Sequence, residues 1–250
     1  MHKIVLITGA TSGIGEATAK ILAEKQYKLI LCGRRQEHLQ KLEALLSSKT
    51  EITTLTFDVR NKNAVFTAIE SLPDSFKNID ILINNAGNAH GLDSIHEGSI
   101  DDWDAMIDIN VKGLLYVSKA ILPVMVGQQS GHIVNIGSIA GKEVYPKGNV
   151  YCASKYAVDA ITQGMRIDLN AYNIKVSEIN PGAVATEFSK VRFKGDIQKE
   201  NNVYEGFEPL RASDVANLIW FIISQPKHVN IAESLILPTA QANATTINRK

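Results

Sequence analysis

Two side chains that could move a proton lie four residues apart in the segment Tyr151-Cys152-Ala153-Ser154-Lys155, so a helix would place them on one face. A phenol with a pKa of about 10 is a poor base at neutral pH, and a neighbouring ammonium favours its phenolate. Ser138 follows an apolar run and could donate a hydrogen bond to a substrate oxygen. Because a Tyr and a Lys at this spacing arise readily by chance, the pair needs support from the rest of the chain.

A glycine-rich turn follows the first apolar run. Residues 4–8 read as a strand, Gly9, Gly13 and Gly15 come next, and residues 16–20 read as a helix. Glycines in this context permit a tight turn and a close backbone approach, so free N–H groups at the helix start can bind a pyrophosphate. A tight turn without a ligand also uses glycine, but the complete strand, turn and helix favour a dinucleotide.

The end of the second predicted strand indicates which dinucleotide binds. Sites for NAD usually place an acid there, on the ribose 2′-hydroxyl, whereas this chain has Arg34 and Arg35. Two guanidiniums can bind a 2′-phosphate through paired hydrogen bonds. A solvated charge pair is the alternative, but together with the glycine turn the two arginines predict NADP.

Apolar runs of strand length alternate with longer stretches of helical period, which is the pattern of βαβ units. We therefore expect an α/β fold: a single domain over residues 1–250, with a Rossmann-like doubly wound sheet of seven parallel strands and helices on both faces. A last helix is predicted to begin with an N-cap at Ser213-Asp214. One predicted helix face consists of Leu39, Leu42, Leu45 and Leu46. The predicted strands are Ile4–Thr8, Leu29–Cys32, Ile52–Phe57, Ile79–Ile83, His132–Ile136, Lys175–Ile179 and Ser234–Leu237.

Residues 187–210 interrupt this alternation. They contain no good strand, and charges, Gly195, Gly206 and Pro209 dominate the segment. A loop of this length in a compact domain is usually a lid or a binding loop, so we expect a substrate loop, with a disordered insertion as the alternative. The polar tail 241–250 is uninformative by itself and could fray.

Charge and composition exclude several classes of protein. Lys plus Arg number 26 and Asp plus Glu number 26, so no basic field holds nucleic acid or an acidic membrane. No run of about 18 apolar residues occurs, and the N-terminal apolar run is too short for a signal-peptide core. Two cysteines make no disulfide framework. The six histidines offer no metal-ligand spacing, and His132 reads as structural. We expect a cytoplasmic protein with no metal, nucleic-acid or membrane partner.

Taken together, these features resemble the short-chain dehydrogenase/reductase family over essentially the whole chain. The resemblance implies that Tyr151 is the general acid/base, Ser138 holds the substrate oxygen, Lys155 binds the nicotinamide ribose, and Asn110 positions a water in a proton relay. It also implies a homotetramer packed through the helices that carry Asn110 and Tyr151. The motifs that carry it are Thr8–Gly15, Asn84-Asn85-Ala86-Gly87, Asn110, Ser138, and Tyr151 with Lys155.

The same resemblance implies a set of cofactor contacts. Asp58-Val59 would lie at the adenine, and the segment from Pro181 to Phe188 would wrap the nicotinamide and phosphates. The alternatives are a strand-end cap at Asp58 and a simple turn at Pro181-Gly182. The full set is Gly9, Ala10, Thr11, Ser12, Gly13, Ile14, Gly15, Arg34, Arg35, Asp58, Val59, Asn85, Ala86, Gly87, Tyr151, Lys155, Pro181, Gly182, Ala183, Val184, Thr186 and Phe188.

Within the family, residues 148–151, 186–196 and 228–231 are similar to NADP-dependent 3-hydroxy acid dehydrogenases, a group that includes serine dehydrogenases. Such enzymes oxidise L-serine, L-allo-threonine and related acids such as 3-hydroxypropionate, and they reduce semialdehydes such as malonic semialdehyde. Asn180 stands where some relatives have an acid, and some carry an additional Gly between residues 182 and 186. A carboxylate substrate needs a cation, for which Arg192, or failing that Lys194, is our candidate.

Two alternative functions stay open at this point. A broader carbonyl reductase, or a 3-oxoacyl reductase, would share the fold and the catalytic residues, and only the substrate loop distinguishes it. An NADPH-binding regulator without turnover belongs to another class. The joint presence of Ser138, Tyr151 and Lys155 argues against that regulator.

Overall fold

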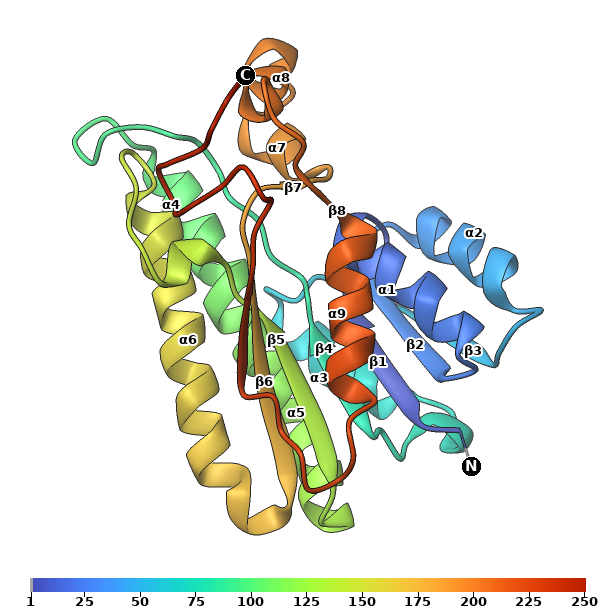
Figure 1. Cartoon of the computed structure of the whole chain (residues 1–250). Helices are drawn as coiled ribbons and strands as arrows, with labels where there is room; N and C mark the ends of the chain where they lie inside the picture. Colours follow the sequence, from blue (N-terminus) through green and yellow to red (C-terminus); the bar gives the residue numbers. More distant parts are fainter. Residues whose placement is uncertain (1) are drawn as a thin grey trace.

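The computed structural model describes residues 2–250 and contains a sheet of seven parallel strands. The chain builds outward from β1 to β3 and then crosses to β4 on the other side of β1, so the strand order reverses between β1 and β4 (Figure 1). The predicted Rossmann-like fold is confirmed. In sheet order the strands are β3 (Ile52–Thr56), β2 (Lys28–Gly33), β1 (Ile4–Thr8), β4 (Ile81–Asn84), β5 (Gly131–Ile136), β6 (Ile174–Pro181) and β9 (Glu233–Ile236).

Helices cover both faces of the sheet (Figure 1). On one face lie α1 (Gly13–Glu24), α2 (Gln36–Leu46) and α9 (Ala212–Ile223), and on the other lie α3 (Lys62–Glu70), α5 (Leu114–Gln128) and α6 (Asn149–Leu169). Successive strand residues point to opposite faces and so supply two cores. In β1, for example, Leu6 joins the core under α5, whereas Val5 and Ile7 join the core under α1.

Three local predictions were wrong. Leu45 is 59% exposed, because Leu39, Leu42 and Leu46 already fill the buried face of α2. The N-cap of α9 is Arg211, whose backbone N–H donates to the Asp214 carboxylate at 2.7 Å, so Ser213 lies inside the helix. Strand β4 begins at Ile81 because Asp80 turns its carboxylate to the backbone N–H of Ile4, at 2.8 Å.

The segment 187–210 is mostly helical. It contains α7 (Phe188–Arg192) and α8 (Ile197–Tyr204), and it leads into β8 (Leu210–Arg211), which pairs with β7 (Val184–Ala185). It therefore contains more regular structure than the predicted loop, and the alternative of a disordered insertion does not describe it. The segment 187–210 has no apolar period, so the sequence did not predict its two short helices, which lie above the carboxyl ends of the strands (Figure 1).

The C-terminal tail is attached to this segment. The Arg249 guanidinium donates to the carbonyl oxygens of Val203 and Glu205, and the backbone N–H of Lys250 donates to Gly206 at 2.8 Å. Figure 1 shows the C-terminus beside α8. These contacts oppose the fraying that the polar composition suggested.

One continuous helical stretch, 100–128, is long and apolar enough to cross a membrane by length and composition, with a mean hydropathy of 1.4. It consists of α4 (Ile100–Ile107), the π-helical turn η2 (Asp108–Gly113) and α5. Val117, Ile121 and Met125 of α5 are fully buried in the core under the sheet. Packing within the domain therefore accounts for much of its apolar character.

His132 is buried at the start of β5, and its Nε2 lies 2.8 Å from Ser177 Oγ. Burial lowers the pKa of this imidazole to about 3, so it is neutral and structural at neutral pH. Among residues 2–250, no group of three or more His, Cys, Asp or Glu side chains could hold a metal ion.

Candidate active site

A cleft of about 340 Å³ opens at the carboxyl ends of the strands, where the strand order reverses. Open α/β sheets bind their ligands at this position. Most of the predicted residues line it, while Ala10, Gly15, Asn110, Ala183 and Arg192 do not. The predicted residues that do are Gly9, Thr11, Ser12, Gly13, Ile14, Arg34, Arg35, Asp58, Val59, Asn85, Ala86, Gly87, Ser138, Tyr151, Lys155, Pro181, Gly182, Val184, Thr186 and Phe188.

The cleft also contains residues that sequence reasoning missed. Most of them are neighbours in sequence of a predicted residue, so their position near the end of a predicted strand could have indicated that they line the cleft. Ile109, from the helix that carries Asn110, gave no such signal. The missed residues are Cys32, Gly33, Phe57, Asn88, Ile109, Ile136, Gly137, Glu187 and Val191.

The turn between β1 and α1 requires glycine at specific positions. Gly9 and Gly13 have φ of +65° and +53°, a region that side chains disfavour. A Cβ at Gly15 would lie 2.3 Å from the Gly9 carbonyl oxygen and 2.5 Å from Asn85 Nδ2. Gly15 therefore serves the turn and not the cleft. Ser12 caps α1 without a side-chain hydrogen bond, which leaves the first N–H groups of the helix for a ligand.

Two polar side chains fix this turn to the end of β4. Asn85 Nδ2 donates to the carbonyl oxygens of Thr8 and Gly9, at 3.0 and 3.2 Å. Thr8 Oγ1 accepts from the backbone N–H groups of Asn85 and Ala86, each at 3.0 Å. Asn85 thus shapes the phosphate-binding turn as well as lining the cleft.

The two predicted arginines differ in their contacts. Arg34 is 55% exposed, and its closest acid, Asp58, lies 3.7 Å away. Arg35 donates to the Thr11 carbonyl at 2.9 Å and pairs with Glu187 at 3.1 Å. Asp58 is closer to Arg60, at 2.6 Å, than to Arg34. Partial burial raises the pKa of the Asp58 carboxyl, but the hydrogen bonds from Arg60 and the charges of Arg60 and Arg34 outweigh it and lower that pKa. Of the two arginines, Arg34 therefore has fewer close contacts within the protein and more donors left for a ligand in the cleft.

Ser138 and Tyr151 both line the cleft. Ser138 begins the short helix η3 (Ile139–Gly141) after β5. Its backbone N–H donates to Asn180 Oδ1 at 2.9 Å, and its hydroxyl accepts from the Ala140 N–H at 3.1 Å. The Tyr151 ring packs edge-on against Phe188, with centroids 5.6 Å apart. Burial raises the pKa of Tyr151 well above its usual range, against the Ser138 hydrogen bond and the charge of Arg192, which lower it.

Lys155 is also buried, one helical turn after Tyr151 on α6. Its Nζ donates to the Ile136 carbonyl oxygen at 2.9 Å. Burial lowers the pKa of this ammonium to about 8, and the carboxylate charge of Glu178 opposes that shift. The predicted pair is therefore assembled on one helix face beside Ser138.

Asn110 lies behind the cleft, in the π-helical turn η2. Its Oδ1 accepts from the Asn88 N–H at 2.9 Å, and its Nδ2 donates to the Asn88 carbonyl and to Ser154 Oγ at 2.8 and 3.0 Å. The side-chain amide thus holds the wall of the cleft to α6. The implied role in positioning a water stays a prediction.

Arg192 ends α7 beside Tyr151. Its guanidinium carbon lies 5.7 Å from the Tyr151 ring centroid and 5.5 Å from that of Tyr145, and Nε donates to the Gly91 carbonyl at 3.1 Å. Nη2 is buried and has no hydrogen-bond partner among the residues that the structure describes. Because a buried unpaired donor costs about 1–3 kcal/mol, an anion bound here would be stabilised. Lys194, the second candidate, pairs with Asp102 at 3.0 Å.

Comparisons with known proteins agree with this geometry. The sequence profile described as short chain dehydrogenase matches residues 3–196. NADP-dependent 3-hydroxy acid dehydrogenase YdfG of Salmonella typhi is 44% identical over 242 residues, which cover 96% of this chain and 97% of that protein. Sulfoacetaldehyde reductase 2 of Chromohalobacter salexigens is 42% identical, with 97% and 96% covered.

Solved structures give the same result. The closed form of a serine dehydrogenase complexed with NADP+ superimposes with a TM-score of 0.93 at 44% identity, over 99% of this chain and 100% of that one. The family profile covers more than half of the chain, and the relatives exceed 40% identity over nearly all of it. The chain therefore belongs to the short-chain dehydrogenase family, as the motifs predicted, and is an oxidoreductase that acts on hydroxyl groups.

Proposed function

We propose that this enzyme transfers hydride between NADP(H) and a small 3-hydroxy acid, of the L-serine, L-allo-threonine or 3-hydroxypropionate and malonic semialdehyde type. The observation that carries the proposal is the guanidinium of Arg192, which packs on the Tyr151 ring with one buried donor unpaired. A hydroxy acid that places its hydroxyl at Tyr151 has its carboxylate only a few bonds away. The names of the relatives, which refer to 3-hydroxy acids, serine and an anionic aldehyde, support a small anionic substrate.

NADP is the cofactor. The glycine turn offers the N–H groups of a helix start to a pyrophosphate, and Arg34 and Arg35 stand where a 2′-phosphate lies in this fold. Arg35 pairs with Glu187 at 3.1 Å, whereas Arg34 lies 3.7 Å from Asp58, whose closer partner is Arg60, so Arg34 is the freer donor for a phosphate. The relatives named above include an NADP-dependent enzyme and a complex with NADP+. We assign the cofactor contacts to the predicted residues that line the cleft, with Ala10, Gly15 and Ala183 supporting them.

The bound nicotinamide supplies or accepts the hydride, and the chain's own residues handle the proton. Tyr151 donates its phenolic proton to the carbonyl oxygen during reduction and takes the hydroxyl proton during oxidation. Ser138 donates a hydrogen bond to the same oxygen, which stabilises the developing alkoxide. Lys155 binds the nicotinamide ribose, and its ammonium favours the phenolate over the phenol.

The alternatives differ in what they require of the site. A carbonyl or 3-oxoacyl reductase needs no cation beside the phenol, whereas a hydroxy acid dehydrogenase does. A non-catalytic NADPH-binding regulator needs none of Ser138, Tyr151 and Lys155 together, yet all three converge on the cleft. We also assign the enzyme to the cytoplasm, which fits two free cysteines, Cys32 and Cys152.

Light scattering tests a proposed homotetramer built on α5 and α6. Apolar side chains remain exposed on these helices, among them Leu115 at 40% and Ile167 at 77%. Burying such side chains between subunits is the usual source of stability for closed assemblies. We expect a tetramer at micromolar concentration, and a monomer there would contradict the assembly.

Tyr151→Phe removes only the proton-transfer group. We expect the variant to keep its fold and its NADPH affinity and to lose at least about nine-tenths of turnover, because the ring packing against Phe188 is unchanged. Steady-state kinetics and fluorescence titration of NADPH measure the two quantities. A variant that retains more than about a tenth of wild-type turnover would show that Tyr151 is not the acid/base.

Arg34→Ala tests the choice of cofactor. The wild type should prefer NADP to NAD, and the variant should lose about 1.5–3 kcal/mol of binding to the 2′-phosphate, roughly 10- to 100-fold in kcat/KM for NADP alone. Lys49→Ala is the control, since Lys49 pairs with Glu24 and does not line the cleft. Equal kcat/KM for the two cofactors in the wild type would refute the assignment.

Arg192→Ala tests the substrate class, with L-serine, 3-hydroxypropionate and an uncharged alcohol as substrates. Loss of the partner of a desolvated carboxylate costs about 2–5 kcal/mol, so kcat/KM for the two acids should fall roughly 30-fold or more, mainly through KM. Lys194→Ala is the control, because its ammonium already pairs with Asp102. Equal losses on all three substrates, or faster wild-type turnover of the uncharged alcohol, would favour the carbonyl-reductase alternative.

A further inference from the structure

A buried carboxyl group lies in β6 directly behind the catalytic residues. Glu178 is 1% exposed, and neither of its oxygens has a hydrogen-bond donor among the residues that the structure describes. Its closest cation, Lys142 Nζ, lies 3.9 Å from Oε2, beyond hydrogen-bond distance. Since a buried charge without hydrogen bonds is costly even beside one cation, the ionisation of this group needs an explanation.

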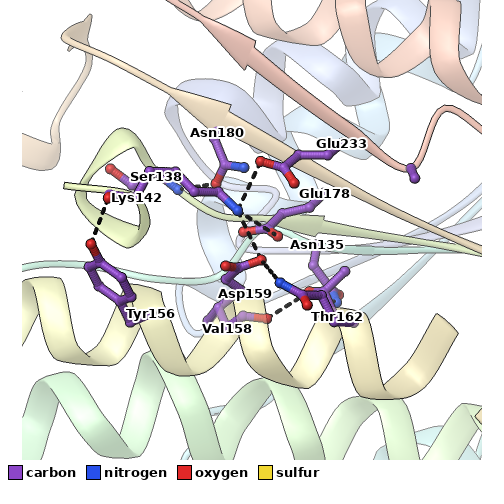
Figure 2. Close-up of polar contacts among 12 residues, drawn as sticks. Asn135, Ser138, Lys142, Tyr156, Val158, Asp159, Thr162, Glu178, Asn180 and Glu233 are labelled. Carbon is purple, nitrogen blue, oxygen red and sulfur yellow. Dashed lines mark hydrogen bonds and ion pairs between the residues drawn. The ribbon is translucent and has the colours of Figure 1, made fainter. Parts of the chain in front are cut away.

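Figure 2 shows the polar cluster around it. Lys142, which follows η3, pairs with Asp159 of α6 at 2.9 Å and with Glu233 of β9 at 2.8 Å. Gln163 also donates to Asp159 at 2.9 Å. Three carboxyl groups thus face one ammonium, and Asp159 is close enough to hydrogen-bond Glu178. A proton held by Glu178 and donated to Asp159 would satisfy both side chains at low pH.

Glu178 also adjoins the turn that carries the catalytic groups. A Cβ at Gly137 would lie 2.3 Å from Glu178 Oε1 and 2.1 Å from Asn180 Oδ1, so only glycine leaves room for these two side chains. The preceding residue, Ile136, accepts the hydrogen bond of Lys155 Nζ at 2.9 Å. The carboxyl group and the catalytic ammonium therefore adjoin two consecutive residues at the end of β5.

We propose that Glu178 is a positioning residue that holds Lys155 in its ammonium form. This rests on the proposed role of Lys155 in binding the nicotinamide ribose and favouring the Tyr151 phenolate. In the ionised state Glu178 pairs with Lys142 and also provides a buried negative charge that acts on Lys155, and in the protonated state it is a neutral donor to Asp159. The groups that face it are Lys142, Asp159 and Glu233 of the edge strand, and its charge also acts on Lys155.

The ionisation of Glu178 falls within the working range of such an enzyme. Burial raises the pKa of its carboxyl to about 7, Lys142 opposes this, and Asp159 and Glu233 add to it. Above that pH the carboxylate raises the pKa of Lys155, which burial alone depresses. Above about pH 7, the negative charge of Glu178 therefore favours the positive charge of Lys155. This is the pH range in which dehydrogenation needs a phenolate at Tyr151.

Glu178→Gln keeps the shape of the side chain and removes its charge. We expect the falling alkaline limb of kcat/KM for NADP+-dependent oxidation to move to lower pH by about 0.5 unit or more, because Lys155 loses its counter-charge. Glu178→Asp should restore much of the wild-type limb. Glu233→Gln is the matched control, because it removes a charge from the same cluster but from a side chain that is 46% exposed. The alkaline limb of kcat/KM for this variant should stay at the wild-type pH.

A profile for Glu178→Gln that superimposes on that of the wild type would overturn the proposal, as would an equal shift for Glu233→Gln. A second measurement uses the wild-type enzyme alone and keeps the test valid if the Gln variant does not fold. Infrared difference spectra should show a protonated carboxyl band that disappears with a midpoint near pH 7. A carboxyl group at position 178 that stays protonated to pH 9 carries no charge for Lys155 and refutes the idea.

The two readouts also separate this inference from the proposed function. The infrared titration needs no substrate, and the pH profile can be measured on any alcohol that the enzyme oxidises. If L-serine and related acids are not turned over, the proposed substrate class fails while the role of Glu178 is still tested.

Discussion

The geometry of the site depends on a close contact between the turn after β5 and helix α6. A Cβ at Gly141 would lie 2.7 Å from the Lys155 carbonyl oxygen. The two backbones can therefore lie this close together only because residue 141 is glycine. The Tyr156 hydroxyl donates to the Lys142 carbonyl at 2.6 Å, and Lys142 Nζ reaches Asp159. Ser138 comes from the turn and Tyr151 from the helix, so this contact sets the distance between the two groups to which we assign the substrate oxygen. Sites held on packed elements in this way lose little energy to reorganisation during reaction.

Much of the fold follows from local sequence because its strands are continuous apolar runs. A central parallel strand is buried on both faces, so β1 and β4 need no alternation to be recognised. The glycine turn and the Tyr151–Lys155 spacing likewise carry their chemistry in adjacent residues. The features that escaped prediction depend on contacts between distant segments. Arg211 caps α9 through its backbone, and residues 188–204 form helices without an apolar period.

The buried polar residues show the same limit more sharply. The sequence predicts no role for Glu178, which stands between Ser177 and Ile179 in a strand, and it is buried. Only the absence of a side chain at Gly137, directly after the neighbouring strand β5, makes that burial possible. Asn110 was predicted from the resemblance, but its π-helical turn, which aims the amide at Asn88 and Ser154, has no signature in hydrophobic periodicity.

The proton chemistry of Tyr151 is set by opposing effects. Burial favours the neutral phenol, while the guanidinium of Arg192 favours the phenolate. An acid substrate paired with Arg192 would place a carboxylate beside that guanidinium and cancel most of its charge as seen by the phenol. Lys155 would then be the cation that remains to stabilise the phenolate. Because burial depresses the pKa of Lys155 to about 8, the ammonium is itself close to losing its proton in the alkaline range. An enzyme that oxidises acids therefore needs a counter-charge at Lys155 more than one that oxidises neutral alcohols, and Glu178 is placed to provide it.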